Sequence, residues 1–540
     1  MAEQRIVLLS GRIASGKSEL ARRLSSLPGS VLVKTKDMIL RHSPRTPVER
    51  RPMQKVGDRL DRETDGQWIS SELANRIRTE EATTIASLVV VDAVRIKKQI
   101  DHIRHTFSSG YRVVHVHVTA PEHELERRFK ERQRPGDPEK YEDVVIGNRT
   151  ERQVEKLLEV ADIVISTYRC TAEDVLMQAI AALGLRVRSV EPCVDVLVGG
   201  QYGSEGKGHV ASYLAKEYGY LLRVGGPNAG HKVYLGDPHT YNHLPSGTQH
   251  NKTAKLILGP GAQIRVAKLL SEIGESFVEH GRLWIDPQAM IIEDQDVKEE
   301  TKLVDNIAST GQGVGASAAR RIMGRGDPEK KVRLAADIPE LQPYIRRTIE
   351  VLDEAYESGQ KLFLEGTQGT SLSLFHGLYP HVTSRDTTAS GCMAEAGIPA
   401  RRVRKVIMVC RTYPIRVGDT KGSSGPMSQP LEWEEIAKRS EIPLRELYEK
   451  ELTSTTKRLR RIAEFDWVQL RRSTLLNAPT DIALTFVDYL SIKNRDARRY
   501  EQLTDETIRF IEEVERVAAV SVSLINTRFH WRSVIDRRTW

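Results

Sequence analysis

Two glycine-rich loops, each with a lysine, could hold the phosphates of a nucleotide. The first, Gly11-Arg-Ile-Ala-Ser-Gly-Lys-Ser18, is a complete GxxxxGK[ST] motif. In such a loop the glycines let backbone N–H groups approach phosphate oxygens, the lysine neutralises their charge, and the serine hydroxyl serves as a ligand of Mg²⁺. We therefore predict that a nucleoside triphosphate binds to Gly11, Gly16, Lys17 and Ser18, with Ser18 as the metal ligand.

The second loop, Gly199-Gly-Gln-Tyr-Gly-Ser-Glu-Gly-Lys-Gly208, is of another kind. Gln201 stands where GxxxxGK[ST] requires its first glycine, and His209 rather than Ser or Thr closes the segment. The loop still combines glycines with Lys207 directly before a helical pattern, an arrangement that surrounds phosphate oxygens with backbone N–H groups. It predicts a second phosphate site with different chemistry.

Both loops need a strand before them and a helix after them, and the apolar pattern supplies these elements. Residues 5–10 and 194–198 are apolar runs typical of buried strands, and residues 19–24 and 209–218 have helical spacing. Further strands are expected at 87–91, 111–118, 161–166 and 221–224, and further helices at 96–103, 122–134 and 172–183. Strands that alternate with helices indicate an α/β fold with parallel sheets.

The unit around the first loop resembles nucleoside-monophosphate and dephospho-coenzyme A kinases. Asp92 ends the strand at 87–91, where a water-bridged ligand of Mg²⁺ is expected; the alternative is that Asp92 caps the helix at 96–103. The helix at 122–134 resembles the lid of such kinases. Residues 34–68 would hold the acceptor, with Asp37, Arg41, Arg45, Arg50 and Arg51. A degenerate kinase fold with a regulatory role is the second interpretation.

The composition of the 540-residue chain is that of a globular protein with more than one domain. Its 81 basic and 73 acidic residues leave a net charge of +8, which is small for this length and does not predict a nucleic-acid partner. No apolar run approaches the roughly 20 residues of a membrane span. Four scattered cysteines without a CxxC pair indicate free thiols rather than a metal site. We expect a cytoplasmic protein without a membrane or nucleic-acid partner.

Short sequence blocks, within the second loop and C-terminal to it, match the pattern of one known protein family. In chain order those behind it are Arg223-Val-Gly-Gly-Pro-Asn-Ala-Gly-His231, Ser309-Thr-Gly-Gln-Gly-Val-Gly315, Leu364-Glu-Gly-Thr-Gln-Gly-Thr370, Tyr379-Pro-His-Val-Thr-Ser384, Thr455-Thr-Lys-Arg-Leu-Arg460 and Leu484-Thr-Phe-Val-Asp488. Together with the loop at 199–208 they resemble the adenylosuccinate synthetase family. The expected organisation is two α/β domains: a P-loop kinase-like parallel sheet at 1–186, a linker at 187–193, and an adenylosuccinate synthetase-like domain at 194–540.

The resemblance implies ligase chemistry in two steps. Members of the family phosphorylate O6 of a 6-oxopurine nucleotide with a nucleoside triphosphate and Mg²⁺, and the amine of L-aspartate then displaces the phosphate. By match to the family's blocks, Ser204, Lys207 and His231 are the implied catalytic residues, with His231 as the general acid. The implied metal ligands are Ser204 and the carbonyl of Gly230.

The other matched positions are implied to bind substrates. They are Gly203, Glu205, Gly206, Gly208 and Asp488 for the triphosphate, Asn228, Thr310, Gln368 and Thr383 for the purine monophosphate, and Thr455, Thr456, Arg458 and Arg460 for aspartate. The family also borrows an arginine from a partner subunit near residues 320–325, where Arg321, Gly324 and Arg325 compete for the position. A homodimer is therefore expected.

One residue of the second loop departs from the family. Ser204 stands where the family has an aspartate that removes the N1 proton of IMP and binds Mg²⁺. Either the protein only senses nucleotides, or its substrate has changed. Serine leaves room at the N1/C2 edge for the C2 amino group of guanine, as in the phage-type synthases that act on dGMP. GMP or dGMP is thus the favoured substrate, and ordinary adenylosuccinate synthesis from IMP and GTP is the rival.

The residues expected to bind the donor nucleotide also depart from the family pattern. Asp488 matches the carboxylate that reads the guanine of GTP, but Phe486 replaces a lysine, and the segment Leu524-Ile-Asn-Thr-Arg-Phe529 lacks the family's Gly-Pro-Asp. ATP and dATP therefore compete with GTP as the donor. The fused kinase-like domain could phosphorylate the ligase product or supply its substrate.

Overall fold

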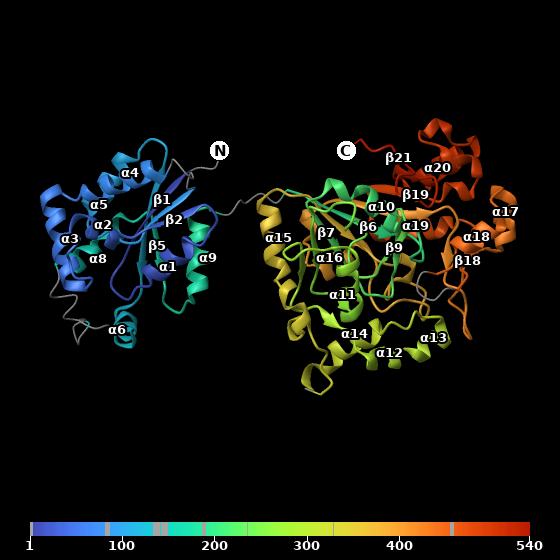
Figure 1. Ribbon diagram of the computed structural model, residues 1–540, viewed down its shortest axis with the longest axis horizontal. Helices are drawn as coiled ribbons and strands as arrows, with labels where there is room; N and C mark the ends of the chain where they lie inside the picture. The colour runs from blue at the N-terminus through green and yellow to red at the C-terminus, as the bar shows by residue number, and fades with distance from the viewer. Residues whose placement is uncertain are drawn as a thin grey trace. The chain divides into compact units, whose positions relative to one another are not determined.

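The computed structural model describes residues 4–80, 87–132, 141, 149–185, 191–234, 236–327, 329–453 and 458–539. The chain forms two compact units, Met1–Arg188 and Ser189–Trp540. Each unit has its own sheet and its own hydrophobic cores (Figure 1). Most of the segment that was expected to form the linker lies outside the described residues.

The first unit is built on a parallel five-stranded sheet with the order β2-β3-β1-β4-β5. Its strands are β1 (Arg5–Ser10), β2 (Ser30–Val33), β3 (Leu88–Val91), β4 (Arg112–Thr119) and β5 (Ile163–Ser166). Alternating side chains of β1 enter two cores, Ile6 and Leu8 on one face and Val7 and Leu9 on the other. The strands expected at 5–10, 87–91, 111–118 and 161–166 are confirmed, and β2 is an addition.

Helices cover both faces of this sheet. On one face lie α1 (Lys17–Leu24) and α9 (Ala172–Ala182); on the other lie α2 (Thr35–His42), α3 (Arg50–Thr64), α4 (Trp68–Glu80) and α5 (Lys97–Thr106). The unit is completed by α6 (Glu122–Glu131), α8 (Arg149–Lys156) and η1 (Leu157–Val160). The expected acceptor region is therefore helical, and the expected lid helix ends at Glu131 within the described residues.

The second unit is built on a nine-stranded sheet with the order β12-β10-β7-β14-β6-β15-β19-β20-β21. Its strands are β6 (Val194–Gly199), β7 (Tyr220–Arg223), β10 (Lys255–Leu258), β12 (Leu283–Ile285), β14 (Leu362–Glu365), β15 (Val403–Arg411), β19 (Asp481–Thr485), β20 (Val522–Asn526) and β21 (Val534–Asp536). All neighbours are parallel except β20 and β21. The strand order reverses around β6, so the ends of β6, β14 and β15 form the switch point where ligands of α/β proteins bind.

Helices pack on both faces of this sheet as well. One core includes Val196 of β6 and side chains from α15 (Thr348–Glu357), α16 (Ala389–Ala396), α19 (Trp467–Asn477) and α20 (Asp505–Ala518). The opposite core includes Leu197 of β6 and side chains from α10 (Lys207–Leu214) and α11 (Val266–Glu275). Burial on both faces explains why β6 is apolar apart from Asp195, whose buried carboxylate accepts from Arg404.

Smaller elements extend from the ends of the large sheet. They are the ladder of β8 (His231–Tyr234) and β9 (Pro238–Tyr241), the pair of β11 (Gln263–Ile264) and β13 (Met290–Ile291), the sheet of β16 (Ile415–Arg416), β17 (Pro430–Leu431) and β18 (Arg461–Ala463), and the helices α12 (Asp294–Glu299), α13 (Thr301–Ile307), α14 (Val314–Met323), α17 (Trp433–Ser440) and α18 (Leu444–Lys450). Among the described helices, none is long and apolar enough to cross a membrane. The four cysteines are free thiols.

Candidate active site

The second phosphate loop joins β6 to α10 and is held in shape by two glycines. Gly203 has φ of 102° and Gly206, at the N-terminus of α10, has φ of 86°, a left-handed conformation that favours glycine. A Cβ at Gly206 would also lie 3.2 Å from the ring of Phe486. The loop therefore requires these glycines and packs against the end of β19.

Glu205 lies inside this loop and holds its backbone by hydrogen bonds. Its carboxylate accepts hydrogen bonds from the backbone N–H groups of Gln201 (3.0 Å) and Gly203 (2.7 Å), and from the amine of Lys207 (2.7 Å). The side chains of Glu205 and Lys207 are each 1% exposed. The lysine charge is thus balanced and held at the loop, and Glu205 organises the backbone rather than facing solvent.

His231 begins β8 and pairs with a carboxylate at the end of β14. Its Nδ1 lies against Oε1 of Glu365, and the same oxygen lies 3.4 Å from Nη1 of Arg223. The other oxygen of Glu365, Oε2, accepts from the N–H of Ser246 (2.7 Å). Burial and the charge of Arg223 lower the pKa of His231 to about 4, although Glu365 opposes this shift. The imidazole is therefore neutral near pH 7, and its Nδ1–H donates to Glu365. Its Nε2 is buried and has no partner among the described residues.

A cavity of about 180 Å³ opens beside this loop. Its lining includes Ser204, Lys207, Gly230, His231, Arg411 and Arg460. Five of these six residues were expected to act on the phosphates, the metal or aspartate, and the structure brings them to one space. The location at the carboxyl ends of β6 and β15 is the one that the sheet topology favours.

Arg411, which ends β15, and Glu451, which follows α18, complete the cavity and were missed from the sequence. Arg411 donates to Glu451 (2.8 Å) and lies 3.4 Å from the carbonyl oxygen of Ser204. Its guanidinium lies 4.1 Å from the ring centroid of Phe486. The signal available for Arg411 was its place at the carboxyl end of an apolar strand, and the same signal applied to Glu365.

Three of the four residues expected to hold the purine monophosphate lie together. The amide of Gln368 donates to the hydroxyl of Thr383 (2.6 Å), and the amide of Asn228 lies 3.5 Å from the same hydroxyl. A Cβ at Gly203 would lie 3.0 Å from Cα of Gln368, so the group adjoins the phosphate loop. Thr310 lies between α13 and α14, and no hydrogen bond between described residues joins it to this group.

The two arginines expected to hold aspartate point to different surroundings. Arg460 lines the cavity and donates to the carbonyl of Leu452 (3.0 Å). Arg458 lies 3.4 Å from the carbonyl of Gly418 and is not part of the cavity lining. The matching threonines, Thr455 and Thr456, lie outside the described residues.

Asp488 is buried beside the cavity rather than in its lining. It is 1% exposed, and its Oδ2 lies 3.5 Å from Arg495. Burial raises its pKa to about 6 despite this arginine. The rings of Phe486 and Phe529 do line the cavity and lie nearly parallel, with centroids 5.9 Å apart. Two aromatic rings therefore line the cavity close to Asp488, the residue expected to recognise the guanine of GTP, whereas Asp488 itself does not.

The first phosphate loop joins β1 to α1 as expected for a P-loop. Gly16 caps α1 with φ of 98°, and the amine of Lys17 donates to the carbonyls of Gly11 (2.5 Å) and Arg12 (3.0 Å). Ser18 follows Lys17 in the first turn of α1. These residues have the strand–loop–helix placement that phosphate binding requires.

Asp92 holds the start of α2. Its Oδ1 accepts from the backbone N–H (2.9 Å) and the hydroxyl (3.2 Å) of Thr35. The alternative, that Asp92 caps the helix at 96–103, is therefore wrong, because the side chain of Gln99 accepts from the backbone N–H of Arg95 at the start of α5 instead. Burial raises the pKa of Asp92. Its role as an indirect metal ligand stays a prediction.

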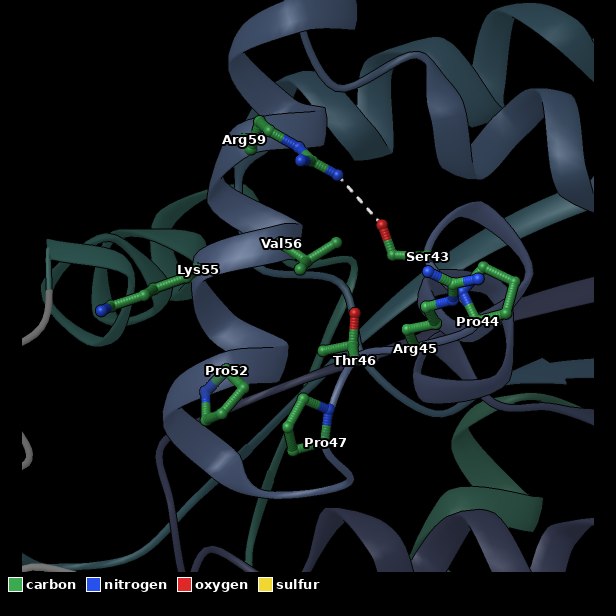
Figure 2. A pocket seen from close by; sticks show the side chains of 9 residues that line it. All are labelled: Ser43, Pro44, Arg45, Thr46, Pro47, Pro52, Lys55, Val56 and Arg59. Atoms are coloured by element: carbon green, nitrogen blue, oxygen red, sulfur yellow. Dashed lines mark hydrogen bonds between the residues drawn. The ribbon is translucent and has the colours of Figure 1, made fainter.

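A second hollow lies in the expected acceptor region of the first unit. It has a volume of about 600 Å³ and lies between α3 and the segment 43–47. Figure 2 shows Arg59 directed to Ser43, to which it donates at 3.0 Å, and Lys55 extended away from that segment. The cations around this hollow, which include Arg45, do not converge on one point, so the geometry defines no particular acceptor.

Fold and site together define a P-loop kinase-like α/β unit joined to an α/β unit with the phosphate loop, histidine–carboxylate pair and arginines of a nucleotide ligase. The chain belongs to the adenylosuccinate synthetase family: the model of that family, "Adenylosuccinate synthetase", matches residues 196–327 and 325–495. A model described as "AAA domain" matches residues 6–157. The chain is thus an enzyme, a C–N ligase of the adenylosuccinate synthetase type with a kinase-like unit.

Individual relatives agree with this assignment. The adenylosuccinate synthetase of Methanocaldococcus jannaschii is 35% identical over 353 residues, which cover 64% of this chain and 96% of the relative. A solved structure of "Cyanophage S-2L Succinoaminodeoxyadenylate synthetase (PurZ) bound to dGMP and dATP as an energy donor" is similar at 26% identity and a TM-score of 0.53, over 65% of this chain and 96% of that one. The adenylosuccinate synthetase of Plasmodium falciparum shares the fold at 22% identity and a TM-score of 0.55, over 64% of this chain and 100% of that one.

Proposed function

We propose that the second unit joins L-aspartate to C6 of a guanine nucleotide, dGMP or GMP, to give a 2-amino-(deoxy)adenylosuccinate. The observation that carries this proposal is Ser204 in the wall of a cavity whose other residues, Lys207, His231, Gly230 and Arg460, are all in place. A protein that had lost catalysis would not be expected to keep this set. The serine removes a charge and volume where the C2 amino group of guanine would lie.

In the first step the purine O6 attacks the γ-phosphorus of the donor, the bond from that phosphorus to the diphosphate breaks, and solvent water accepts the N1 proton. Lys207 and the N–H groups of the loop would stabilise the charge on the transferring group. In the second step the aspartate amine attacks C6, and phosphate departs. The guanidinium of Arg460 suits a carboxylate of aspartate.

His231 needs a proton on Nε2 to act as the general acid. In the ligand-free site its pKa of about 4 leaves that nitrogen unprotonated near pH 7. The negative charge of a bound triphosphate would raise this pKa, because an opposite charge favours the imidazolium. The proton then lies on the nitrogen without a protein partner, and Glu365 balances the charge from the other side.

The site fits Mg²⁺ that keeps water and phosphate ligands. Among the described residues there is no group of three His, Cys, Asp or Glu side chains that could hold a metal. Mg²⁺ is often held by few protein oxygens together with substrate phosphates. The carbonyl of Gly230 and the hydroxyl of Ser204 would supply such oxygens, and the ion would neutralise charge on the triphosphate.

We further propose an adenine nucleotide, ATP or dATP, as the donor. Asp488 is buried and paired with Arg495, and Phe486 and Phe529 present rings to the cavity. An aromatic ring binds a purine by stacking without requiring the pattern of guanine. The related phage synthetase, whose structure is described with dATP as an energy donor, supports this choice.

The first unit, residues 1–186, is proposed to be a nucleotide kinase that uses Lys17 and Ser18 with Mg²⁺. The hollow lined by residues between 43 and 59 does not indicate which acceptor this kinase would phosphorylate. The proposal for the whole protein includes a cytoplasmic homodimer, in which Arg321 or Arg325 of one subunit would reach the site of the other. A sensor without turnover and an IMP- and GTP-dependent synthetase are the alternatives.

Parallel assays separate these alternatives. Purified protein receives IMP, GMP or dGMP, each with L-aspartate, Mg²⁺ and either ATP or GTP, and phosphate release is measured. The proposal expects release with a guanine nucleotide and ATP. Turnover of IMP alone would contradict the proposed substrate, and the absence of release in every mixture would support the sensor.

A further inference from the structure

One buried carboxylate joins two arginines of the ligase cavity. Glu451 is 2% exposed. Its Oε1 accepts from Arg411 (2.8 Å) and from the hydroxyl of Tyr489 (2.6 Å), and its Oε2 lies 3.4 Å from Nη1 of Arg460. All three charged side chains line the cavity that contains Ser204.

Arg411 connects this carboxylate to the phosphate loop. One of its terminal nitrogens donates to Glu451, and the other lies 3.4 Å from the carbonyl oxygen of Ser204. The guanidinium also lies over the rings of Phe486 and Tyr489, at 4.1 and 5.3 Å from their centroids. Its position between the loop and β15 is therefore set by Glu451 on one side and by aromatic rings on another.

Arg460 is fixed by the same residue through side chain and backbone. Its backbone N–H donates to the carbonyl of Glu451 (3.1 Å), in addition to the side-chain pair. The segment that carries Arg460 therefore moves with Glu451. A shift of this carboxylate would displace the arginine expected to hold aspartate and the arginine at the phosphate loop together.

The charge balance of this group favours anionic substrates. Burial alone would raise the pKa of Glu451, but the charges of Arg411 and Arg460 outweigh it and lower the pKa, so the carboxylate is ionised. One negative and two positive charges leave a net positive charge at the cavity wall. A positive charge there stabilises the ionised form of a 6-oxopurine after N1 has lost its proton.

We infer that Glu451 is a positioning residue of the ligase, which sets Arg411 for the phosphoryl-transfer step and Arg460 for aspartate binding. The inference rests on the proposed ligase activity but not on the choice between guanine and hypoxanthine. Glu451 touches no reacting atom and acts through the two arginines. No carboxylate of the phosphate loop is needed for either effect, which fits a loop with serine at position 204.

The test is steady-state kinetics of Glu451→Gln with whichever purine nucleotide the unaltered protein converts. Loss of hydrogen bonds to a charged partner is expected to raise the KM for aspartate about tenfold and to lower kcat about tenfold. The KM of the purine nucleotide should stay within about twofold. Tyr489→Phe is the matched control, since it removes the third bond to the same carboxylate and keeps both arginine pairs; its parameters should stay close to those of the unaltered protein.

Two further variants extend the test, and the first of them keeps the inference open to contradiction if Glu451→Gln does not fold. Glu451→Asp retains the charge with a shorter reach and should show the same pattern with smaller changes. In an Arg460→Gln background, a second change of Glu451→Gln should leave the KM for aspartate unaltered while kcat still falls. Three results would overturn the inference. One is a change in Glu451→Gln that is equal for kcat and for the KM values of both substrates, and another is kinetics of Glu451→Gln like those of the unaltered protein. The third is a KM for aspartate in the double variant that shows the effects of the two single changes added together. Conversion of IMP but not dGMP would contradict only the proposed substrate.

Discussion

At the scale of single residues, Ser204 is the position where this loop departs from the aspartate that the family resemblance implies. The serine lies in the cavity wall, and its carbonyl is oriented toward Arg411. We propose that a side chain with no charge and little volume at this point leaves space at the N1/C2 edge of the purine. On that proposal the departure concerns which purine binds, whereas Lys207 and the loop glycines concern phosphate binding in general.

Ser204→Asp should lower kcat/KM for dGMP by about tenfold or more, since lost complementarity of roughly 1.4 kcal/mol is a factor of ten. The reason is that the longer side chain fills the space for the C2 amino group. Ser204→Ala is the control, because it removes the hydroxyl without adding volume. Coupled phosphate release measures both, and a gain in dGMP turnover by Ser204→Asp would disprove the assigned role.

The resemblance of short blocks to a known family indicated several components of the candidate ligase site but not the residues that hold them. Lys207, His231 and Arg460 lie together as the blocks implied. Glu365, which pairs with His231, lies 134 residues from it in the chain, and Glu451 lies 40 residues from Arg411. These hydrogen bonds depend on the register of β14 and on the position of α18, and no local pattern contains that information.

At the scale of elements, three buried histidines make the stability of the second unit depend on pH. His209 in α10, His231 at the start of β8 and His250 have pKa values lowered by burial to about 3, 4 and 4. In the unfolded chain these histidines have the ordinary pKa of about 6.5 and bind protons as the pH falls below it. In the folded chain they stay neutral until the pH approaches their lowered pKa values. Stability is therefore lost as the pH falls from about 6.5 toward 4.

Lowering the pH from 7.5 to 5.5 should reduce the free energy of unfolding of this unit by about 4 kcal/mol through the three histidines. Urea denaturation followed by tryptophan fluorescence measures the effect. His209→Phe keeps the aromatic packing against Tyr234 and Phe529 and should reduce the pH dependence by about a third. Equal stability at the two pH values would contradict this account.

The strands were also more predictable than the helices between them. Apolar runs of four to eight residues identified β1, β3, β4, β6 and β7 because buried parallel strands are largely apolar on both faces. The helices α2, α3 and α4 escaped prediction, since their sequence is rich in charge and their burial comes from packing on the sheet. The contact of Asp92 with Thr35 was missed for the same reason: α2, which begins at Thr35, was not expected.

At the scale of the whole molecule, the chain combines two phosphate loops in two units with separate cores. Each loop is built from a strand and a helix of its own unit. The hydrogen bonds that shape each loop also stay within its unit. The two chemistries should therefore be separable by mutation.

Lys17→Ala should abolish nucleotide-dependent phosphotransfer by the first unit and leave ligase turnover within about twofold. Lys207→Ala should lower ligase turnover at least about a hundredfold, because a positive charge on the transferring phosphoryl group is lost. Phosphate release that depends on aspartate reports the ligase, and hydrolysis of ATP without aspartate reports the first unit. Loss of ligase turnover in Lys17→Ala would show that the units depend on each other.

The central claim is that the ligase prefers a guanine nucleotide, and a competition assay tests it most directly. Equimolar dGMP and IMP are incubated with the protein, L-aspartate, Mg²⁺ and ATP, and the two products are quantified by mass spectrometry at low conversion. The product ratio equals the ratio of the kcat/KM values. We predict an excess of 2-aminodeoxyadenylosuccinate of at least about tenfold, a difference of roughly 1.4 kcal/mol. An excess of adenylosuccinate would contradict the claim.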